Sequence, residues 1–270
     1  MSGPRRPGFA LSAGISLLGT GLMILLPLSA LAVRALQART GTFAALLGDP
    51  RVRTACLFSL GTAFAAALFN LVWGTLLAWV LVRYPFPGRR LVDALVDLPF
   101  ALPTAVAGLT LASLYGPRGW IGGLLPFPVA YSAPGVVLAL AFVGLPFVVR
   151  SVQPVLEELP RELEEAAACL GASRWATLRR VVLPQLRPAM LSGFALAFAR
   201  AVGEYGSVVF VSGNLPFRTE IAPLLIVVKL EQYDVDGATA LAALLLALSL
   251  VVLLAIHLLQ RRLGAPARHA

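Results

Sequence analysis

Long apolar runs without charge alternate with short charged segments along the chain. No charged residue lies between Arg6 and Arg34, and a second charge-free run lies between Arg53 and Arg83. A helix that crosses a bilayer needs roughly 20 apolar residues. The pattern therefore predicts an all-α polytopic membrane protein with six transmembrane helices, at Leu11–Val33, Cys56–Val82, Leu98–Tyr115, Ala133–Val149, Pro188–Val211 and Gly237–Gln260.

Two of the six expected spans have unusual features. The third is short and contains Pro99 and Pro103, and the fifth contains two charged residues, Arg200 and Glu204. Between the fifth and sixth spans, the apolar stretch Ile221–Val228 is too short to cross a membrane. We expect this stretch to form a short element at the outer side.

The first apolar run resembles a secretory signal. Arg5 and Arg6 precede it, and Ala30-Leu31-Ala32 has the small-x-small form of a cleavage site. However, the run is longer than the hydrophobic region of a signal peptide, and five further spans follow. An uncleaved first helix is the favoured interpretation.

Composition supports a membrane protein and excludes some functions. Residues are 59% hydrophobic and 13% charged, whereas soluble domains carry about 25% charged residues. The net charge of +9 comes from short basic clusters between apolar runs. No continuous basic stripe with interleaved aromatic residues is present, so nucleic acid is not an expected partner.

The basic clusters also predict the orientation in the bilayer. If both termini are cytoplasmic, basic residues in the cytoplasmic segments outnumber those in the outer segments, as the positive-inside rule requires. The four arginines of the first outer loop, Arg34, Arg39, Arg51 and Arg53, oppose this bias. We divide the chain into residues 1–53, with the first helix and outer loop, a core transmembrane domain at 54–260, and a basic cytoplasmic tail at 261–270.

The sequence offers no metal site and no catalytic centre. Cys56, Cys169, His257 and His269 are scattered and do not form a ligand cluster. A G-x-x-x-x-G-K-[ST] loop, a G-x-S-x-G elbow and an H-E-x-x-H helix are all absent from the sequence. We therefore expect no cofactor bound by this chain and no catalytic residue in it.

A long polar loop, Arg150–Arg187, separates the fourth and fifth spans. Its first helix is predicted to open at Pro160, to carry Glu162, Glu164 and Glu165 in its first turn, and to end at Gly171. One face of this helix is predicted to be an apolar stripe, formed at helical spacing by Leu163, Ala166, Ala167 and Leu170. Ser173 is expected to cap a second helix, which runs through Trp175 and Leu178 to Leu183 and ends at Pro184.

This predicted hairpin has two interpretations. It is either an amphipathic element on the membrane surface or a docking element for a protein. The polar face of the first helix is acidic, which is the wrong sign for anionic lipid, and its stripe is rich in alanine. Small side chains allow close approach to a protein groove, so we favour a protein partner.

The loop resembles the EAA loop of ABC importer permeases. That pattern is Glu-Ala-Ala, three residues, Gly, nine residues, an aliphatic residue, one further residue and Leu-Pro. It is met by Glu165, Ala166, Ala167, Gly171, Val181, Leu183 and Pro184. The resemblance implies a type I ABC importer permease fold, in which this loop is the cytoplasmic coupling helix that contacts the ATPase.

Further segments resemble the sulfate/thiosulfate branch of these permeases. They are Arg83–Gly116, Pro146–Pro160 and Arg200–Asn214, and Phe217–Asp234 is most similar to the T-type subunit. The segment Arg118–Ala130 shows little similarity. The resemblance implies a second, W-type permease subunit, two ATPase subunits that use the ATP, and a periplasmic sulfate/thiosulfate-binding protein. It also implies the bacterial cytoplasmic (inner) membrane.

Arg200 and Glu204 are four residues apart and share a helix face if the fifth span is continuous. Charges at that depth must face protein or water. One interpretation is a neutralising structural pair. The other places Arg200 near the path of a dianion or at a gate, with Gly203 and Gly206 allowing close packing or a bend.

Other cargoes and other classes remain open at this point. Molybdate and tungstate are tetrahedral dianions like sulfate, so a molybdate/tungstate importer permease is the alternative cargo assignment. An intramembrane enzyme would need a nucleophile, a metal pair or paired acids at depth. A stand-alone channel or ion-coupled carrier would not need the cytoplasmic loop.

Overall fold

The computed structural model describes residues 9–37 and 41–263, and within this part every regular element is helical. Five helices are long and apolar enough to cross a membrane. They are α1 (Phe9–Gln37), α3 (Pro50–Arg83), α7 (Ala133–Glu158), α10 (Leu183–Val202) and α13 (Val235–Leu263). The predicted all-α class is confirmed. The Arg5–Arg6 pair, Arg39, His269 and residues 264–270 of the predicted tail lie outside the described residues.

Local sequence explains the ends of the longest helix. Asp49 caps α3, because its carboxylate accepts a hydrogen bond of 2.8 Å from the backbone N–H of Arg51, and Pro50 occupies the first turn. At the other end, Tyr84 is extended because it precedes a proline. The helix thus begins six residues before the predicted span at Cys56, and the division drawn at residue 53 falls within it.

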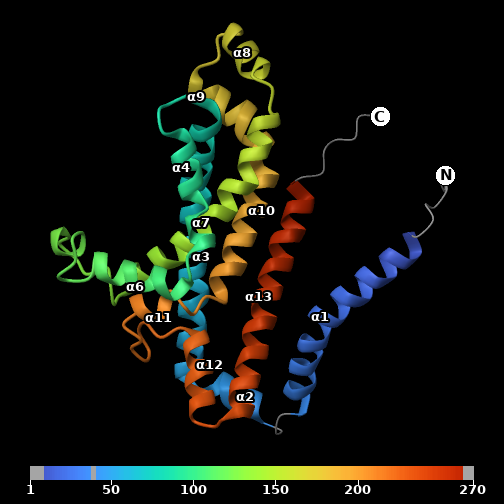
Figure 1. The fold of residues 1–270 in the computed structure, drawn as a ribbon, viewed down its shortest axis with the longest axis vertical. Helices are drawn as coiled ribbons and strands as arrows, with labels where there is room; N and C mark the ends of the chain where they lie inside the picture. Colours follow the sequence, from blue (N-terminus) through green and yellow to red (C-terminus); the bar gives the residue numbers. More distant parts are fainter. Residues whose placement is uncertain (1–8, 38–40, 264–270) are drawn as a thin grey trace.

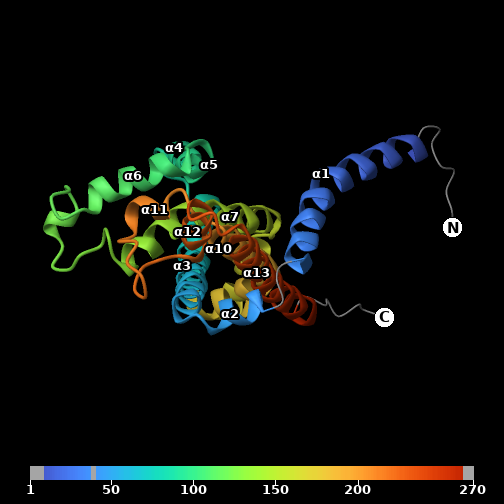
Figure 2. The same ribbon diagram turned by 90° about the horizontal axis from the view of Figure 1, so that it is seen from below.

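The third expected span is not one helix. Leu98–Tyr115 contains α5 (Leu98–Ala101) and α6 (Thr104–Tyr115), separated at Leu102 and Pro103. Proline restricts the preceding residue to extended conformations, which breaks the helix there. The chain returns from the end of α3 first through α4 (Arg89–Val96), and α6 then runs across the direction of α3 (Figures 1 and 2). Three short helices, α4, α5 and α6, therefore follow α3, and the last two replace the single span that the sequence predicted.

The fifth expected span, Pro188–Val211, has different limits. A continuous helical segment starts at Arg174 and ends at Val202, and the short α11 (Val208–Val211) is separate. Gly203 ends α10. The stretch Ile221–Val228 forms most of α12 (Ala222–Glu231), a short helix as expected, with Pro223 in its first turn.

The core is formed where α3, α7 and α10 pack along one another (Figures 1 and 2). Small residues on α3, such as Ala63, Ala66 and Gly74, are buried in these contacts. Small side chains let helix backbones approach closely, which drives helix association in a membrane where water exclusion does not. The main hydrophobic cluster therefore rests on these three helices, and a smaller one joins α6, α7 and α11.

Helix α1 lies apart from this core. Most side chains of α1 are exposed, including Leu17, Met23 and Leu25. The C-terminal part of α1 contacts α13. An apolar helix with so little buried surface is suited to lipid or to another membrane subunit. In Figure 1, α1 starts and α13 ends toward the same end of the molecule as α8 (Glu162–Cys169).

Candidate functional site: the coupling hairpin and the Arg200–Glu204 pair

The coupling hairpin comprises α8 (Glu162–Cys169), α9 (Arg174–Thr177) and the π-helical turn η2 (Leu178–Val182), and it forms one end of the molecule (Figure 1). Glu162, Glu164 and Glu165 occupy the first turn of α8, as the sequence predicts. Negative side chains at this position interact favourably with the helix dipole. The first helix is therefore stabilised locally, without a large apolar contact to the rest of the chain.

Gly171 ends α8 in a Schellman motif. The N–H of Ala172 donates to the carbonyl of Ala167 at 3.0 Å, and the N–H of Gly171 donates to that of Ala168 at 2.9 Å. Gly171 has φ +79°, a left-handed conformation that favours glycine. A Cβ at Gly171 would meet open space, so the constraint is the backbone angle and not a clash.

Ser173 caps the second helix, as predicted: its hydroxyl accepts from the backbone N–H of Ala176 at 3.2 Å. The expected helix end at Pro184, however, is wrong. The helix widens into the π turn η2 and continues directly into α10. A π turn relaxes the usual hydrogen-bond pattern, which accommodates a proline that lacks an N–H. The hairpin is thus joined to a membrane helix without a break in helical structure.

The structure separates the predicted coupling residues into two groups. Glu165, Ala166 and Gly171 are exposed at the tip, with Ala167 partly buried beside them. Val181, Leu183 and Pro184 lie at the root, half-buried where η2 meets α10. Apolar side chains at the tip are strongly exposed, above all Leu170 and Trp175. Such an exposed apolar face is typical of an interaction surface.

Arg200 and Glu204 form an ion pair of 2.5 Å although they do not share a helix. Arg200 is in the last turn of α10, and Glu204 lies in the turn after it. The Glu204 side chain is buried, with 2% exposed, whereas that of Arg200 is 37% exposed. Glu204 also accepts hydrogen bonds from the Ser207 N–H at 2.9 Å and the Ser207 hydroxyl at 3.0 Å.

This turn packs closely on α6. A Cβ on Gly206 would clash with the Thr104 hydroxyl at the start of α6, so only glycine allows the approach. The expectation of close packing is confirmed for Gly206. Gly203 has open space around it and ends the helix. Glu204 is therefore a fixed structural acceptor, and Arg200 is the member of the pair that reaches the surface of this chain.

Sequence reasoning missed three ion-pair links between distant elements. Arg150 on α7 pairs with Asp93 and Asp97 at 2.6 Å each, and Arg51 pairs with Glu220 at 2.6 Å. Arg83 pairs with Glu164 of the coupling hairpin at 2.9 Å. In the sequence these arginines appear only as charges near the ends of spans. Their partners lie far away along the chain, so no local pattern identifies them.

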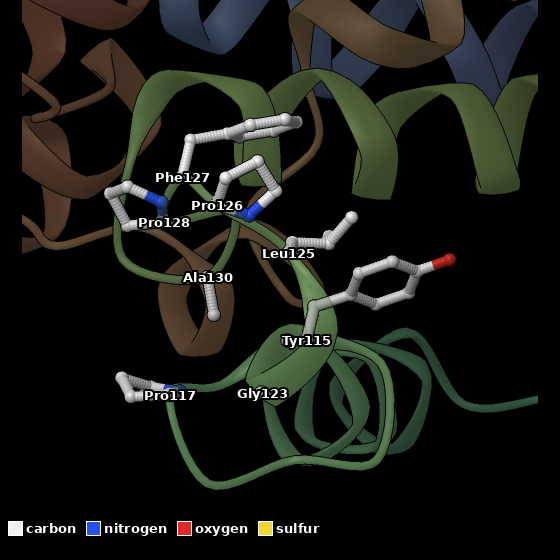
Figure 3. A pocket seen from close by; sticks show the side chains of 9 residues that line it. Tyr115, Pro117, Gly123, Leu125, Pro126, Phe127, Pro128 and Ala130 are labelled. Atoms are coloured by element: carbon white, nitrogen blue, oxygen red, sulfur yellow. The ribbon is translucent and has the colours of Figure 1, made fainter.

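None of these residues lines the cavity of about 290 Å³ that lies between the end of α6 and the loop after it. Its lining includes Tyr115, Pro117, Leu125, Phe127 and Ala130 (Figure 3). No ionisable group other than the Tyr115 phenol lines it. This loop contains the segment Arg118–Ala130, for which the sequence alone indicates little family similarity. We do not assign it a role in the site.

Metal-binding clusters of histidine, cysteine and carboxylate side chains are absent from the residues that the structure describes. Cys56 is buried and Cys169 is exposed on α8. The candidate site therefore consists of a docking surface and a charged turn at the end of a membrane helix.

Comparison with known proteins identifies relatives along nearly the whole chain. The chain is 51% identical to "Sulfate transport system permease protein CysT" of Escherichia coli (strain K12), over 96% of this chain and 94% of that protein. It is 55% identical to "Probable sulfate transport system permease protein cysT" of Nephroselmis olivacea, over 88% and 84%. The CysT protein of Synechocystis sp. is 51% identical, over 89% and 85%.

Solved structures share the fold at lower identity. A bacterial alginate ABC transporter in complex with an alginate pentasaccharide-bound periplasmic protein has a chain with a TM-score of 0.77 and 19% identity, over 96% of each chain. An inward-facing MetNI methionine ABC transporter gives 0.56 at 20% identity, over 77% of this chain and 92% of that chain. These likenesses confirm the ABC importer permease fold.

The model of the family described as "Binding-protein-dependent transport system inner membrane component" matches residues 70–265, which include α7, the coupling hairpin, α10 and all of α13. This match covers most of the chain and agrees with the relatives and with the fold. The chain belongs to the binding-protein-dependent transport system inner membrane component family of ABC importer permeases.

Proposed function

We propose that this chain is the permease subunit through which an ATP-driven importer moves sulfate or thiosulfate across the bacterial cytoplasmic membrane. The observation that carries this proposal is the 51% identity to a sulfate permease over 96% of the chain. The names of the relatives favour sulfate over the molybdate/tungstate alternative. The chain is a multi-pass membrane protein and a transport subunit.

ATP hydrolysis is assigned to partner subunits in this proposal. The sequence lacks a phosphate-binding Walker A loop, and the coupling hairpin offers an exposed, partly apolar tip. We propose that each of two ATPase subunits receives a coupling helix, one from this chain and one from a W-type permease. A periplasmic sulfate/thiosulfate-binding protein would deliver the anion at the opposite end.

The hairpin geometry supports a mechanical role. Because α9 and η2 continue into α10, a displacement of the tip is passed to a membrane helix without a flexible joint. Helices of this kind move as rigid bodies in domain rearrangements. The far end of α10 carries Arg200, so the ATPase contact and the charged turn lie at opposite ends of one helical segment.

A sulfur-nutrition test distinguishes the two cargoes. A strain that lacks this chain is expected not to grow on sulfate as the sole sulfur source, and to grow normally when cysteine is supplied. Its molybdenum-dependent nitrate reduction should be unchanged. Loss of nitrate reduction with normal growth on sulfate would instead support the molybdate/tungstate assignment.

The topology can be tested with a native reporter. Cys169 is exposed on α8, whereas Cys56 is buried. We expect a membrane-impermeant maleimide to label Cys169 only in inside-out vesicles. A variant with Cys169→Ser and Arg218→Cys should be labelled only in intact spheroplasts. The reverse pattern would contradict both cytoplasmic termini and the coupling role of the hairpin.

A further inference from the structure

Arg83, the last residue of α3, lies at the base of the coupling hairpin. Its side chain is 9% exposed and pairs with Glu164 of α8 at 2.9 Å. The same Nη2 donates a hydrogen bond of 3.1 Å to the carbonyl of Leu159, which ends α7. The guanidinium also lies over the Trp79 ring, 5.8 Å from its centroid. One side chain therefore contacts the ends of α3 and α7 and the first turn of α8.

Few other contacts hold α8 to the membrane helices. It packs mainly on α9 and η2, which belong to the same hairpin. A cavity of about 340 Å³ separates the hairpin from the end of α3. Trp79 and Tyr84 line one side of the cavity, and Glu164, Ala168 and Arg174 line the other. The Arg83–Glu164 ion pair crosses between the two sides.

The Arg83 contact has room to adjust. The ion pair does not have hydrogen-bond geometry, and the buried Nε of Arg83 has no acceptor among the described residues. A buried donor without an acceptor is costly. A small reorientation of the guanidinium or of α8 would give these groups hydrogen-bond partners, so the contact tolerates small displacements of the hairpin.

We propose that Arg83 is a positioning residue for energy coupling, which ties the coupling helix to α3 in addition to its covalent connection to α10. When the ATPase subunits displace α8, Arg83 passes the displacement to α3, and the close packing of α3 with α7 moves that helix as well. This role rests on the proposed function. One hairpin then drives α10 through the covalent connection, and α3 together with α7 through Arg83.

The test variant is Arg83→Gln, because glutamine keeps a polar side chain with an N–H donor but has no charge for Glu164. The importer is reconstituted with its ATPase and binding protein in liposomes, and sulfate uptake and ATP hydrolysis are measured together. We expect Arg83→Gln to assemble and hydrolyse ATP, and to import about tenfold less sulfate for each ATP hydrolysed.

Arg89 provides the matched control. It is exposed, belongs to the same cytoplasmic cluster, and has no ion pair in the part of the chain that the structure describes. Arg89→Gln removes the same charge and should leave the ratio of uptake to hydrolysis unchanged. The exchange Arg83→Glu with Glu164→Arg should recover part of the ratio, because it restores the ion pair with reversed charges.

A distance measurement separates coupling from stability. Spin labels are placed at the native Cys169 on α8 and at Val80→Cys, an exposed position on α3, with Cys56→Ser to remove the other thiol. In the otherwise unaltered importer, we expect one narrow distance distribution that persists when nucleotide closes the ATPase. With Arg83→Gln, the distribution should broaden.

The outcomes distinguish the two proposals. An unchanged ratio of uptake to hydrolysis in Arg83→Gln, with an unchanged distance distribution, would show that Arg83 has no role in coupling. A smaller amount of complex with a normal ratio would make it a stability residue only and would also overturn the inference. If the unaltered chain itself imports no sulfate with its ATPase present, the proposed function fails, whatever Arg83 does.

Discussion

Replacing Gly171 by aspartate is expected to lower sulfate uptake strongly while the chain still inserts into the membrane. Gly171 has φ +79° at the end of the coupling helix, where a residue with a Cβ costs about 1–2 kcal/mol. The new carboxylate would also add to the three glutamates of α8 at the surface that we propose meets the ATPase. Unfavourable charges at an interface cost several kcal/mol, so uptake should fall by about tenfold or more.

Gly171→Asn separates the two causes. Asparagine has nearly the shape of aspartate, tolerates the left-handed conformation, and carries no charge. If charge at the docking surface is the cause, the asparagine variant should retain most of its uptake and should co-purify with the ATPase. If the backbone angle is the cause, both variants should fail alike. Normal uptake and normal co-purification in Gly171→Asp would contradict the docking role of the hairpin.

Arg200→Ala is expected to lower sulfate uptake by about 10- to 100-fold in complexes that still assemble, because a hydrogen bond to a charged group contributes about 1.5–3 kcal/mol. The Arg200 side chain is 37% exposed, whereas that of Glu204 is 2% exposed. Arg200 is therefore the member of the pair that can contact an anion. Glu204 retains both hydrogen bonds from Ser207 when Arg200 is removed. Assembly should therefore be affected less than transport.

Glu204 is expected to behave differently from Arg200. Glu204→Ala would leave the buried Ser207 N–H and hydroxyl without their acceptor, which costs about 1–3 kcal/mol for each group. This change should reduce the amount of assembled complex, and Glu204→Gln, which keeps an acceptor, should reduce it less. Measuring assembly and uptake in both single variants and in the double variant tests this division of roles.

A purely structural pair would give another pattern. Arg200→Ala would then lower assembly by leaving a buried carboxylate without its counter-charge, and adding Glu204→Gln would restore both assembly and uptake. The pathway role predicts that the double variant assembles without transporting. Normal uptake in every variant would exclude both roles.

Much of the helical hairpin could be predicted from local sequence. The acidic first turn of α8, the end at Gly171 and the cap at Ser173 depend on residues within a few positions of one another. The error at Pro184 has the same local origin, since proline normally interrupts a helix. The π turn at Leu178–Val182 allows the helix to continue through Pro184. Such a turn has no simple sequence signal.

The membrane spans were predictable where length and hydropathy alone decide, as in α1, α3, α7 and α13. A bilayer demands long, apolar helices whatever their neighbours are. The third and fifth expected spans, Leu98–Tyr115 and Pro188–Val211, had the wrong limits. For α5 and α6, and for the turn after α10, the course of the chain depends on packing against other helices, as the contact of Gly206 with Thr104 illustrates.

By itself, the sequence determined the membrane class, the helical hairpin after α7 and the family resemblance, because each depends on composition or on short-range spacing. Only the tertiary structure decided which charges meet. It placed Glu204 in the interior and Arg200 at the surface, and it brought Arg83 to Glu164 and Arg150 to Asp93. Ion pairs of this kind join helices far apart in the sequence, so they exist only once the helices have packed.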